Sequence, residues 1–186
     1  MAGLAAQRAA LIVQPGSDNN IDLRLRRIEA FEAIRQLIAT YAVGADRKND
    51  PEILGPLFSD EATWEADGIT RLVGRDAIAK GLSGLANDFI TWSLHYMISP
   101  LITVDESAQG AVCRWYLWEL CTMKQQNDEA SDTWYGGWYD SRLSVHDGQW
   151  LFDWVRLDPR LASANDVPWH GKVTNDDEAI PSLSKN

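Results

Sequence analysis

The second half of the chain contains four long strand-like segments, and these constrain its fold more than any other feature. They span about residues 93–104, 109–125, 132–146 and 149–158. Polar runs such as Asp105-Glu106-Ser107 and His146-Asp147-Gly148 separate them, which is typical of tight turns between neighbouring strands. Because parallel strands would need much longer connections, we expect these segments to form an antiparallel meander.

The first half has a helical pattern instead. At 100° per residue, one half of a helical wheel collects apolar side chains: Ile28, Phe31, Ile34, Leu37, Ile38, Tyr41, Ala42 and Ala45. Asn49-Asp50-Pro51 ends this helix, and Gly74-Arg75-Asp76 begins a further one that runs to about Asn87. Helices followed by a meander predict an α+β fold, a cone-shaped barrel of a curved antiparallel sheet wrapped around N-terminal helices. The open end of such a cone would form a cavity.

With 186 residues, the chain is long enough for one domain with its own core. We divide it into an N-terminal arm at 1–26, a domain at 27–159 and a C-terminal tail at 160–186. The arm contains a turn-forming cluster that starts at Pro15, and the tail is polar apart from a few residues such as Trp169.

The net charge of −10, from 17 basic and 27 acidic residues, argues against nucleic acid and anionic membranes as partners, because both need a cationic surface. The N-terminus lacks the apolar run of a signal peptide, and no stretch approaches the ~20 apolar residues of a membrane span, so we expect a cytoplasmic protein. Cys113 and Cys121 are expected to be free, buried thiols, and no Cys or His cluster suggests a metal site. Nine tryptophans favour either a large core or a pocket for flat, apolar ligands.

His95 is the main candidate for chemistry, because it lies alone among apolar and aromatic residues in the segment 92–98. Such a histidine is either a hydrogen-bonded core residue or a general base in a dry pocket. Asp46 follows Ile28 by eighteen residues, or five helical turns, and so points in the same direction at the edge of the apolar arc. A helix residue and a sheet residue could therefore meet inside the cone.

Several short segments occur in an order that matches a known family, and the likeness spans roughly residues 28–158, which is most of the domain. They are Val43-Gly44-Ala45-Asp46-Arg47, Ala62-Thr63-Trp64, Leu94-His95-Tyr96, Gly136-Gly137-Trp138-Tyr139 and Asp147-Gly148-Gln149-Trp150. On these segments the chain resembles the SnoaL-like group of the nuclear-transport-factor-like superfamily, whose members include scytalone dehydratase, bile-acid 7α-dehydratase and hexachlorocyclohexane dehydrochlorinase.

This resemblance implies a lyase that needs neither a metal nor an organic cofactor. It assigns His95 as the base that removes a proton from the substrate, Asp46 as its hydrogen-bonded partner, and Tyr41 as a donor to the leaving group or a developing oxyanion. Strand alternation and the resemblance together suggest four substrate-binding aromatics: Trp64, Tyr116, Trp118 and Tyr139. The implied reaction is a β-elimination from an aromatic or polycyclic hydrophobic molecule, with loss of water or another small fragment such as formaldehyde.

The chain also departs from its relatives. The dehydrochlorinase has a lysine in place of Tyr41 and an arginine near Val155, while the bile-acid enzymes have a second aspartate near Trp118. Scytalone dehydratase has a second active-site histidine with no counterpart that we can place. These residues act on the leaving group, so the leaving group of this chain stays open.

Other roles also stay open, because one fold supports many functions. The chain could be an isomerase or an epoxide hydrolase with a carboxylate-rich pocket, the non-catalytic small subunit of a ring-hydroxylating dioxygenase, or a binding module. We further expect a homo-trimer or homo-dimer built through an outer sheet face that carries Trp115, Leu117, Trp134 and Trp138. By analogy with scytalone dehydratase, the tail around Trp169 would cover the cavity mouth as a lid.

Overall fold

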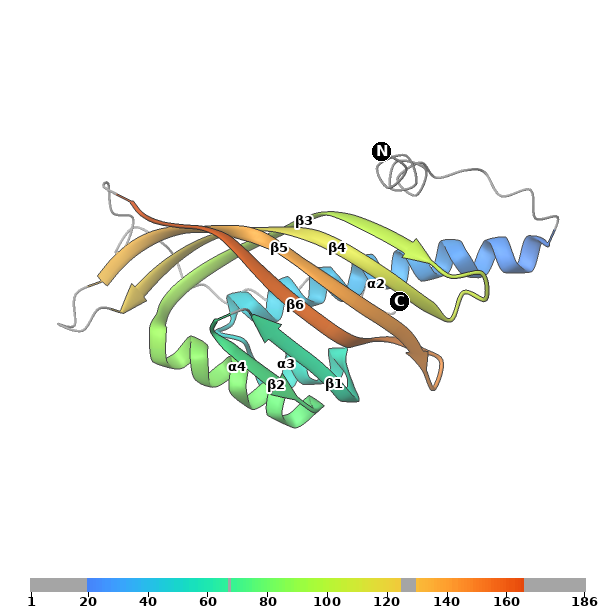
Figure 1. Ribbon diagram of the computed structural model, residues 1–186, viewed down its shortest axis with the longest axis horizontal. Helices are drawn as coiled ribbons and strands as arrows, with labels where there is room; N and C mark the ends of the chain where they lie inside the picture. The colour runs from blue at the N-terminus through green and yellow to red at the C-terminus, as the bar shows by residue number, and fades with distance from the viewer. Residues whose placement is uncertain (1–19, 67, 125–129, 166–186) are drawn as a thin grey trace, which may run out of the picture.

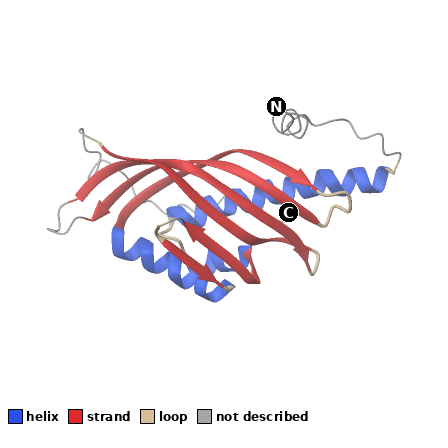
Figure 2. Cartoon of the chain, in the orientation of Figure 1, coloured by secondary structure: helices blue, strands red, loops and turns tan. Residues whose placement is uncertain are grey.

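A computed structural model describes residues 20–66, 68–124 and 130–165, in which helices lie under one face of a curved six-stranded sheet (Figure 1). The helical elements are α2 (Ile21–Asp46), α3 (Pro51–Leu54), a single 3₁₀ turn at Gly55–Leu57, and α4 (Arg75–Phe89). The strands are β1 (Phe58–Ala66), β2 (Thr70–Val73), β3 (Ile90–Val104), β4 (Gly110–Lys124), β5 (Ala130–His146) and β6 (Gln149–Ala164). Figure 2 shows the resulting two layers, with the sheet over the helices.

The strand order is β2-β1-β6-β5-β4-β3, so the predicted meander of four long strands is present as β3 to β6. The α+β class and the curved sheet around N-terminal helices are confirmed. Two details differ from the expectation of an antiparallel barrel. Strand β1 pairs with β6 in parallel, because the chain returns to the sheet beside its last strand, and the sheet stays open with β2 and β3 at its edges.

Helix α2 begins at Ile21, seven residues before Ile28, the first residue of the predicted apolar arc. The side chain of Asn20 caps it by accepting a hydrogen bond from the backbone N–H of Leu23 at 3.2 Å. The early turns project beyond the sheet (Figure 1), which is why Ile28 is 64% exposed although it belongs to the apolar arc. At the other end, β6 runs to Ala164 instead of ending near residue 158.

An aromatic cluster fills the space between α2 and the concave face of the sheet. Tyr41, Phe58, Trp115, Tyr139 and Phe152 contact one another with ring centroids 5.1–6.4 Å apart. All five side chains are buried, and each large aromatic removes about 150–250 Å² from water. The inside of the cone is therefore a packed core around these rings.

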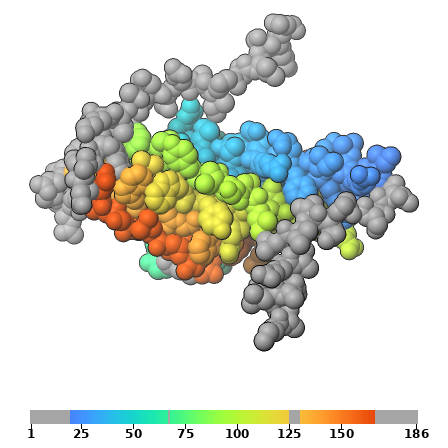
Figure 3. Space-filling view, turned by 90° about the horizontal axis from the view of Figure 1, so that it is seen from above, coloured from blue at the N-terminus to red at the C-terminus, as the bar shows by residue number. Residues whose placement is uncertain are grey.

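The two faces of β4 differ from our expectation. Trp115 and Leu117, predicted on the outer face, lie inside with 0% and 3% exposure, whereas Tyr116 and Trp118 lie outside with 50% and 38%. On β5, Trp138 does lie outside, where its ring contacts Tyr116. The outer face formed by β3 to β6 is the one seen in Figure 3.

Cys113 and Cys121 are buried and free, as predicted. Within the described residues, no helix is long and apolar enough to cross a membrane. The proposed lid around Trp169 lies outside the described residues and stays a prediction.

Candidate active site

Asp46 and His95 are in direct contact. Oδ1 of Asp46 accepts a hydrogen bond from the backbone N–H of His95 at 2.7 Å and lies 2.9 Å from its ring Nδ1. The His95 side chain is 9% exposed and that of Asp46 is 33% exposed, so the carboxylate reaches solvent while the ring is covered. One carboxylate oxygen thus sets both the backbone position and the ring orientation of the histidine.

This contact depends on where β3 lies in the sheet. As an edge strand, β3 has no partner beyond it to pair with the outward-facing N–H of His95, and the last residue of α2 meets that group. The turn after the helix supports this position. Asn49 donates its side-chain amide to the carbonyl of Leu82 on α4 at 3.1 Å, which ties the end of α2 to α4.

Glu119 is a second carboxyl group at the histidine, and the sequence interpretation missed it. It pairs directly with His95 across β3 and β4, and its Oε2 lies 3.5 Å from Nε2 of His95. Since the N–H of His95 is used by Asp46, the pair is of the non-hydrogen-bonded type, in which side chains lie closer together. A lone charge on the same alternating face as Trp115 and Leu117 was the signal that could have revealed it.

Burial raises the pKa of Glu119 above its ordinary value; the neighbouring His95 opposes this shift and Asp46 adds to it. The side chain of Cys121 also lies within hydrogen-bonding reach of this carboxyl group. A buried carboxyl group with a raised pKa can hold a proton at neutral pH and act as an acid. The histidine therefore has a hydrogen-bonded carboxyl partner, Asp46, at one ring nitrogen and a candidate proton donor, Glu119, beside the other.

Tyr41 lies deeper in the core. Its hydroxyl oxygen accepts a hydrogen bond from Nε1 of Trp64 at 2.9 Å and is within hydrogen-bonding reach of the hydroxyl of Tyr139. Burial raises the pKa values of both tyrosines. The charges of Tyr41 and Glu119 add to the effect of burial on the pKa of Tyr139.

Of the four predicted substrate-binding aromatics, Trp64 and Tyr139 lie on the inner side of the sheet. Tyr116 and Trp118 do not, because register fixes their face: Tyr96 on β3 pairs with Trp118, whereas His95 pairs with Glu119. The ring of Trp118 packs over Gly136, where an added Cβ would come within 3.1 Å of it, and against Trp134 at 5.3 Å. Their expected orientation into the pocket was wrong.

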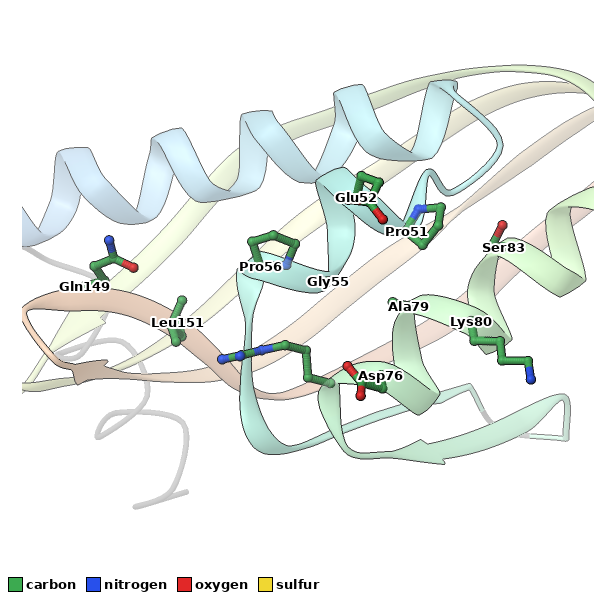
Figure 4. A pocket seen from close by; sticks show the side chains of 11 residues that line it. Pro51, Glu52, Gly55, Pro56, Asp76, Ala79, Lys80, Ser83, Gln149 and Leu151 are labelled. Atoms are coloured by element: carbon green, nitrogen blue, oxygen red, sulfur yellow. The ribbon is translucent and has the colours of Figure 1, made fainter.

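Two hollows in the described part of the chain lie away from the dyad. The larger, of about 720 Å³, lies between α3, α4 and the start of β6 (Figure 4) and is lined by residues such as Pro51, Arg75, Lys80 and Leu151. The smaller, of about 360 Å³, lies on the outer face beside the ion pair of Arg114 and Asp140. Within the described residues, no group of three histidine, cysteine or acidic side chains could hold a metal ion.

Comparison with known proteins agrees with this architecture. Residues 26–156 match the family model of the SnoaL-like domain. The structure superposes on LinA with a TM-score of 0.71 at 16% identity, covering 77% of this chain and 95% of that one. It superposes on the type 3 hexachlorocyclohexane dehydrochlorinase of Novosphingobium barchaimii LL02 with a TM-score of 0.70 at 18% identity (78% and 99% covered).

A third solved structure, a candidate scytalone dehydratase from Novosphingobium aromaticivorans DSM 12444, gives a TM-score of 0.66 at 23% identity, with 77% of this chain and 92% of that one covered. At these identities the likenesses show a shared fold. No curated protein sequence matches the chain.

Proposed function

The chain belongs to the SnoaL-like family, and we propose that it is a cofactor-independent lyase that eliminates water or another small fragment from an aromatic or polycyclic hydrophobic molecule. His95 is the general base, Asp46 orients it, and Tyr41 donates a hydrogen bond to developing negative charge. The hexachlorocyclohexane dehydrochlorinases with the same fold are lyases by name, which supports this class of reaction.

The observation that carries the proposal is the pair of contacts from Asp46 to His95. A carboxylate at Nδ1 favours the tautomer with its proton on Nδ1, so that Nε2 keeps the lone pair that a base needs. The same carboxylate stabilises the imidazolium that forms. Histidine is the side chain most often used as a general base, and each acid or base group contributes about 10²–10⁴-fold.

Glu119 completes the elimination. Nε2 of His95 takes a proton from carbon, the electron pair of that C–H bond forms a C=C bond, and the C–O bond on the neighbouring carbon breaks. Protonated Glu119 gives its proton to the departing oxygen, and water leaves. The imidazolium then returns a proton to the Glu119 carboxylate, which lies 3.5 Å away, and both groups are reset.

In a substrate with a hydroxymethyl group, His95 removes the hydroxyl proton of that group instead. The C–C bond to the hydroxymethyl carbon then breaks to release formaldehyde, its electron pair forms the C=C bond, and the neighbouring hydroxyl leaves as water with the proton of Glu119. Trp64 and Tyr139, on the inner side of the sheet, remain our candidates for contact with the aromatic part of the substrate.

The test is a panel of aromatic β-hydroxy compounds and 1,3-diols, assayed for alkene formation by ultraviolet absorbance and mass spectrometry. His95→Ala should remove activity while leaving the thermal unfolding temperature close to that of the wild type. His146→Ala is the matched control, since this exposed histidine is the last residue of β5 and pairs with Asp153. Equal activity of the wild type and His95→Ala would reject His95 as the base.

The proximity of His95 and Glu119 also favours one second candidate, an isomerase that moves a proton between two carbons of the same molecule. Product mass separates the two, because isomerisation leaves it unchanged and elimination lowers it by the mass of the leaving fragment. A purified chain inactive on the whole panel would instead favour a non-catalytic subunit or a binding module.

We also propose that the chain forms a homo-trimer or homo-dimer through the outer sheet face. That face carries large apolar side chains that are 38–53% exposed: Tyr96, Ile98, Leu101, Val112, Tyr116 and Trp118. A monomer rarely leaves such a contiguous apolar surface in water. The sequence had suggested Trp115 and Leu117 as interface residues, but both lie inside. The exposed apolar side chains of β3 and β4 named above take their place in the proposed interface.

A further inference from the structure

The hydrogen bonds inside the aromatic core leave donors without acceptors. Trp64 can only donate, and it donates to Tyr41, whose hydroxyl lies within reach of that of Tyr139. If Tyr41 donates to Tyr139, the proton of Tyr139 is left over. If Tyr139 donates to Tyr41, the proton of Tyr41 is left over. In either arrangement these three groups hold one phenolic O–H with no acceptor among them.

Trp115 adds a second donor of this kind. Its side chain is 0% exposed, and its Nε1 has no hydrogen-bond partner. The indole is stacked on the ring of Tyr139, with centroids 5.1 Å apart and an interplanar angle of 16°. A buried donor without a partner destabilises the folded protein, and a phenylalanine would fill an apolar position without that cost.

We propose that the indole N–H of Trp115 and the spare phenolic O–H of the Tyr41–Tyr139 pair form a binding subsite for a hydrogen-bond-accepting oxygen on an aromatic substrate. Both donors can hydrogen-bond to a single carbonyl or phenolate oxygen, which carries no proton of its own, so the site favours such an oxygen over a hydroxyl. This inference rests on the proposed function, to which it adds the chemical class of the substrate.

The subsite lies at a useful distance from the base. Trp115 and Glu119 are on the same face of β4, four residues apart, or roughly 13 Å along an extended strand. An aromatic ring system spans that distance, so an oxygen bound at Trp115 can be conjugated with the carbon that loses its proton near His95. Hydrogen bonds to such an oxygen then stabilise the negative charge that develops on it.

Trp115 is fully covered in the free chain, so a neighbouring ring such as that of Phe152 has to turn aside when the ligand enters. We therefore expect slow ligand association, as is usual when binding requires a conformational change.

The experiment compares benzophenone with 1,1-diphenylethylene, two probes of nearly the same shape in which a carbonyl oxygen is replaced by a CH₂ group. Titration of the wild type, followed by the indole N–H signals of ¹⁵N-tryptophan-labelled protein, should show benzophenone binding about 10-fold more tightly. The Nε1–H signal of Trp115 should move downfield with benzophenone only.

Trp115→Phe identifies that signal and should reduce the preference for the ketone to less than about 3-fold, since one hydrogen bond is lost. Trp138→Phe is the matched control and should leave the preference unchanged, because the Nε1 of Trp138 is also unpartnered but its ring lies on the outer face between Arg114 and Arg160. If Trp115→Phe does not fold, the affinities of the two probes are compared in the wild type and in Tyr139→Phe instead. The preference for the ketone should then be smaller in Tyr139→Phe, because a phenolic donor is lost.

Equal affinity of the two probes, no detectable binding of benzophenone, or a full ketone preference in Trp115→Phe would each overturn the subsite. Neither probe has a leaving group, so this result is independent of catalysis. Tighter binding of the ketone, together with no activity on the substrate panel, would support the subsite and reject the lyase. Activity on the panel, together with equal binding of the two probes, would support the lyase and reject the subsite.

Discussion

Oδ1 of Asp46 lies 2.7 Å from the backbone nitrogen of His95 and 2.9 Å from its ring Nδ1, so a single oxygen holds the histidine twice. The backbone contact fixes where the residue lies, and the ring contact fixes how the imidazole is turned. Substitutions of Asp46 can therefore show whether it acts by positioning His95 or by the negative charge of its carboxylate.

Asp46→Asn keeps an oxygen that can accept both hydrogen bonds but removes the negative charge that stabilises the imidazolium. We expect kcat to fall by about 10²–10⁴-fold with little change in KM. Asp46→Ala should lose activity and also about 1–2 kcal/mol of folding stability, because the N–H of His95 then has no acceptor. Steady-state kinetics and urea unfolding measure both effects, and equal stability of the two variants would contradict the role of the backbone contact.

Glu119→Gln tests the acid. The raised pKa means that folded Glu119 retains its proton at pH values where an unfolded glutamate has lost it, so wild-type stability falls as pH rises from the ordinary glutamate range to the raised value. The variant lacks this titration and should be the more stable protein at neutral pH. Thermal unfolding temperatures measured across pH 4–9 check this, and a wild-type curve that rises over the same interval would contradict it.

The same substitution should change the pH–rate profile. Activity of the wild type falls at high pH as Glu119 loses the proton that the leaving group needs. Glu119→Gln cannot supply a proton, so kcat should drop by about 10²–10⁴-fold and the remaining activity should lose its alkaline limb. Glu65→Gln is a suitable control, since that carboxylate accepts from Trp154 on a different part of the sheet.

Tyr116→Lys should weaken the oligomer. Tyr116 is 50% exposed near the centre of the outer face, and a charge there has to be buried when subunits associate. Sedimentation velocity should show a shift towards the monomer, whereas Lys80→Glu on exposed α4 should leave the assembly unchanged. A wild type that sediments as a monomer at micromolar concentration would remove the proposed interface altogether.

Lys48→Gly and Lys80→Gly should change stability in opposite directions. Lys48 has φ +58°, a left-handed conformation that costs a residue with a Cβ about 1 kcal/mol, so glycine should stabilise the turn after α2 by up to that amount. Lys80 is an exposed interior residue of α4, where glycine costs about 1 kcal/mol. Urea unfolding followed by tryptophan fluorescence compares the two, and destabilisation by both would show that the left-handed backbone at position 48 is not strained.

The helix pattern and the strand segments were sufficient to predict the α+β layout and to bring Asp46 towards His95. The helical wheel gave the direction of Asp46, and a lone histidine among apolar residues marked the strand opposite. The start of α2 could not be placed because Asn20 belongs to a polar turn-like cluster, and only the cap shows that it begins the helix.

Which face of β4 is inner could not be predicted from alternation alone. Both faces of the segment 112–122 are rich in apolar groups, so Trp115 and Tyr116 are equally plausible core residues by pattern. The register with β3 decides, because it places Glu119 opposite His95 and so turns every odd-numbered residue of that stretch inward. Glu119 was overlooked for the same reason.

The hydrogen bond from His95 to Asp46 also has a consequence for solubility. Exposed sheet edges recruit strands from other chains and lead to aggregation, and proteins protect them with charges placed where pairing would begin. From the end of α2, Asp46 accepts a hydrogen bond from the backbone N–H of His95, which lies in the apolar stretch Leu94-His95-Tyr96 of the edge strand β3. We therefore expect an acidic residue at position 46 to protect this edge whether or not the chain has catalytic activity.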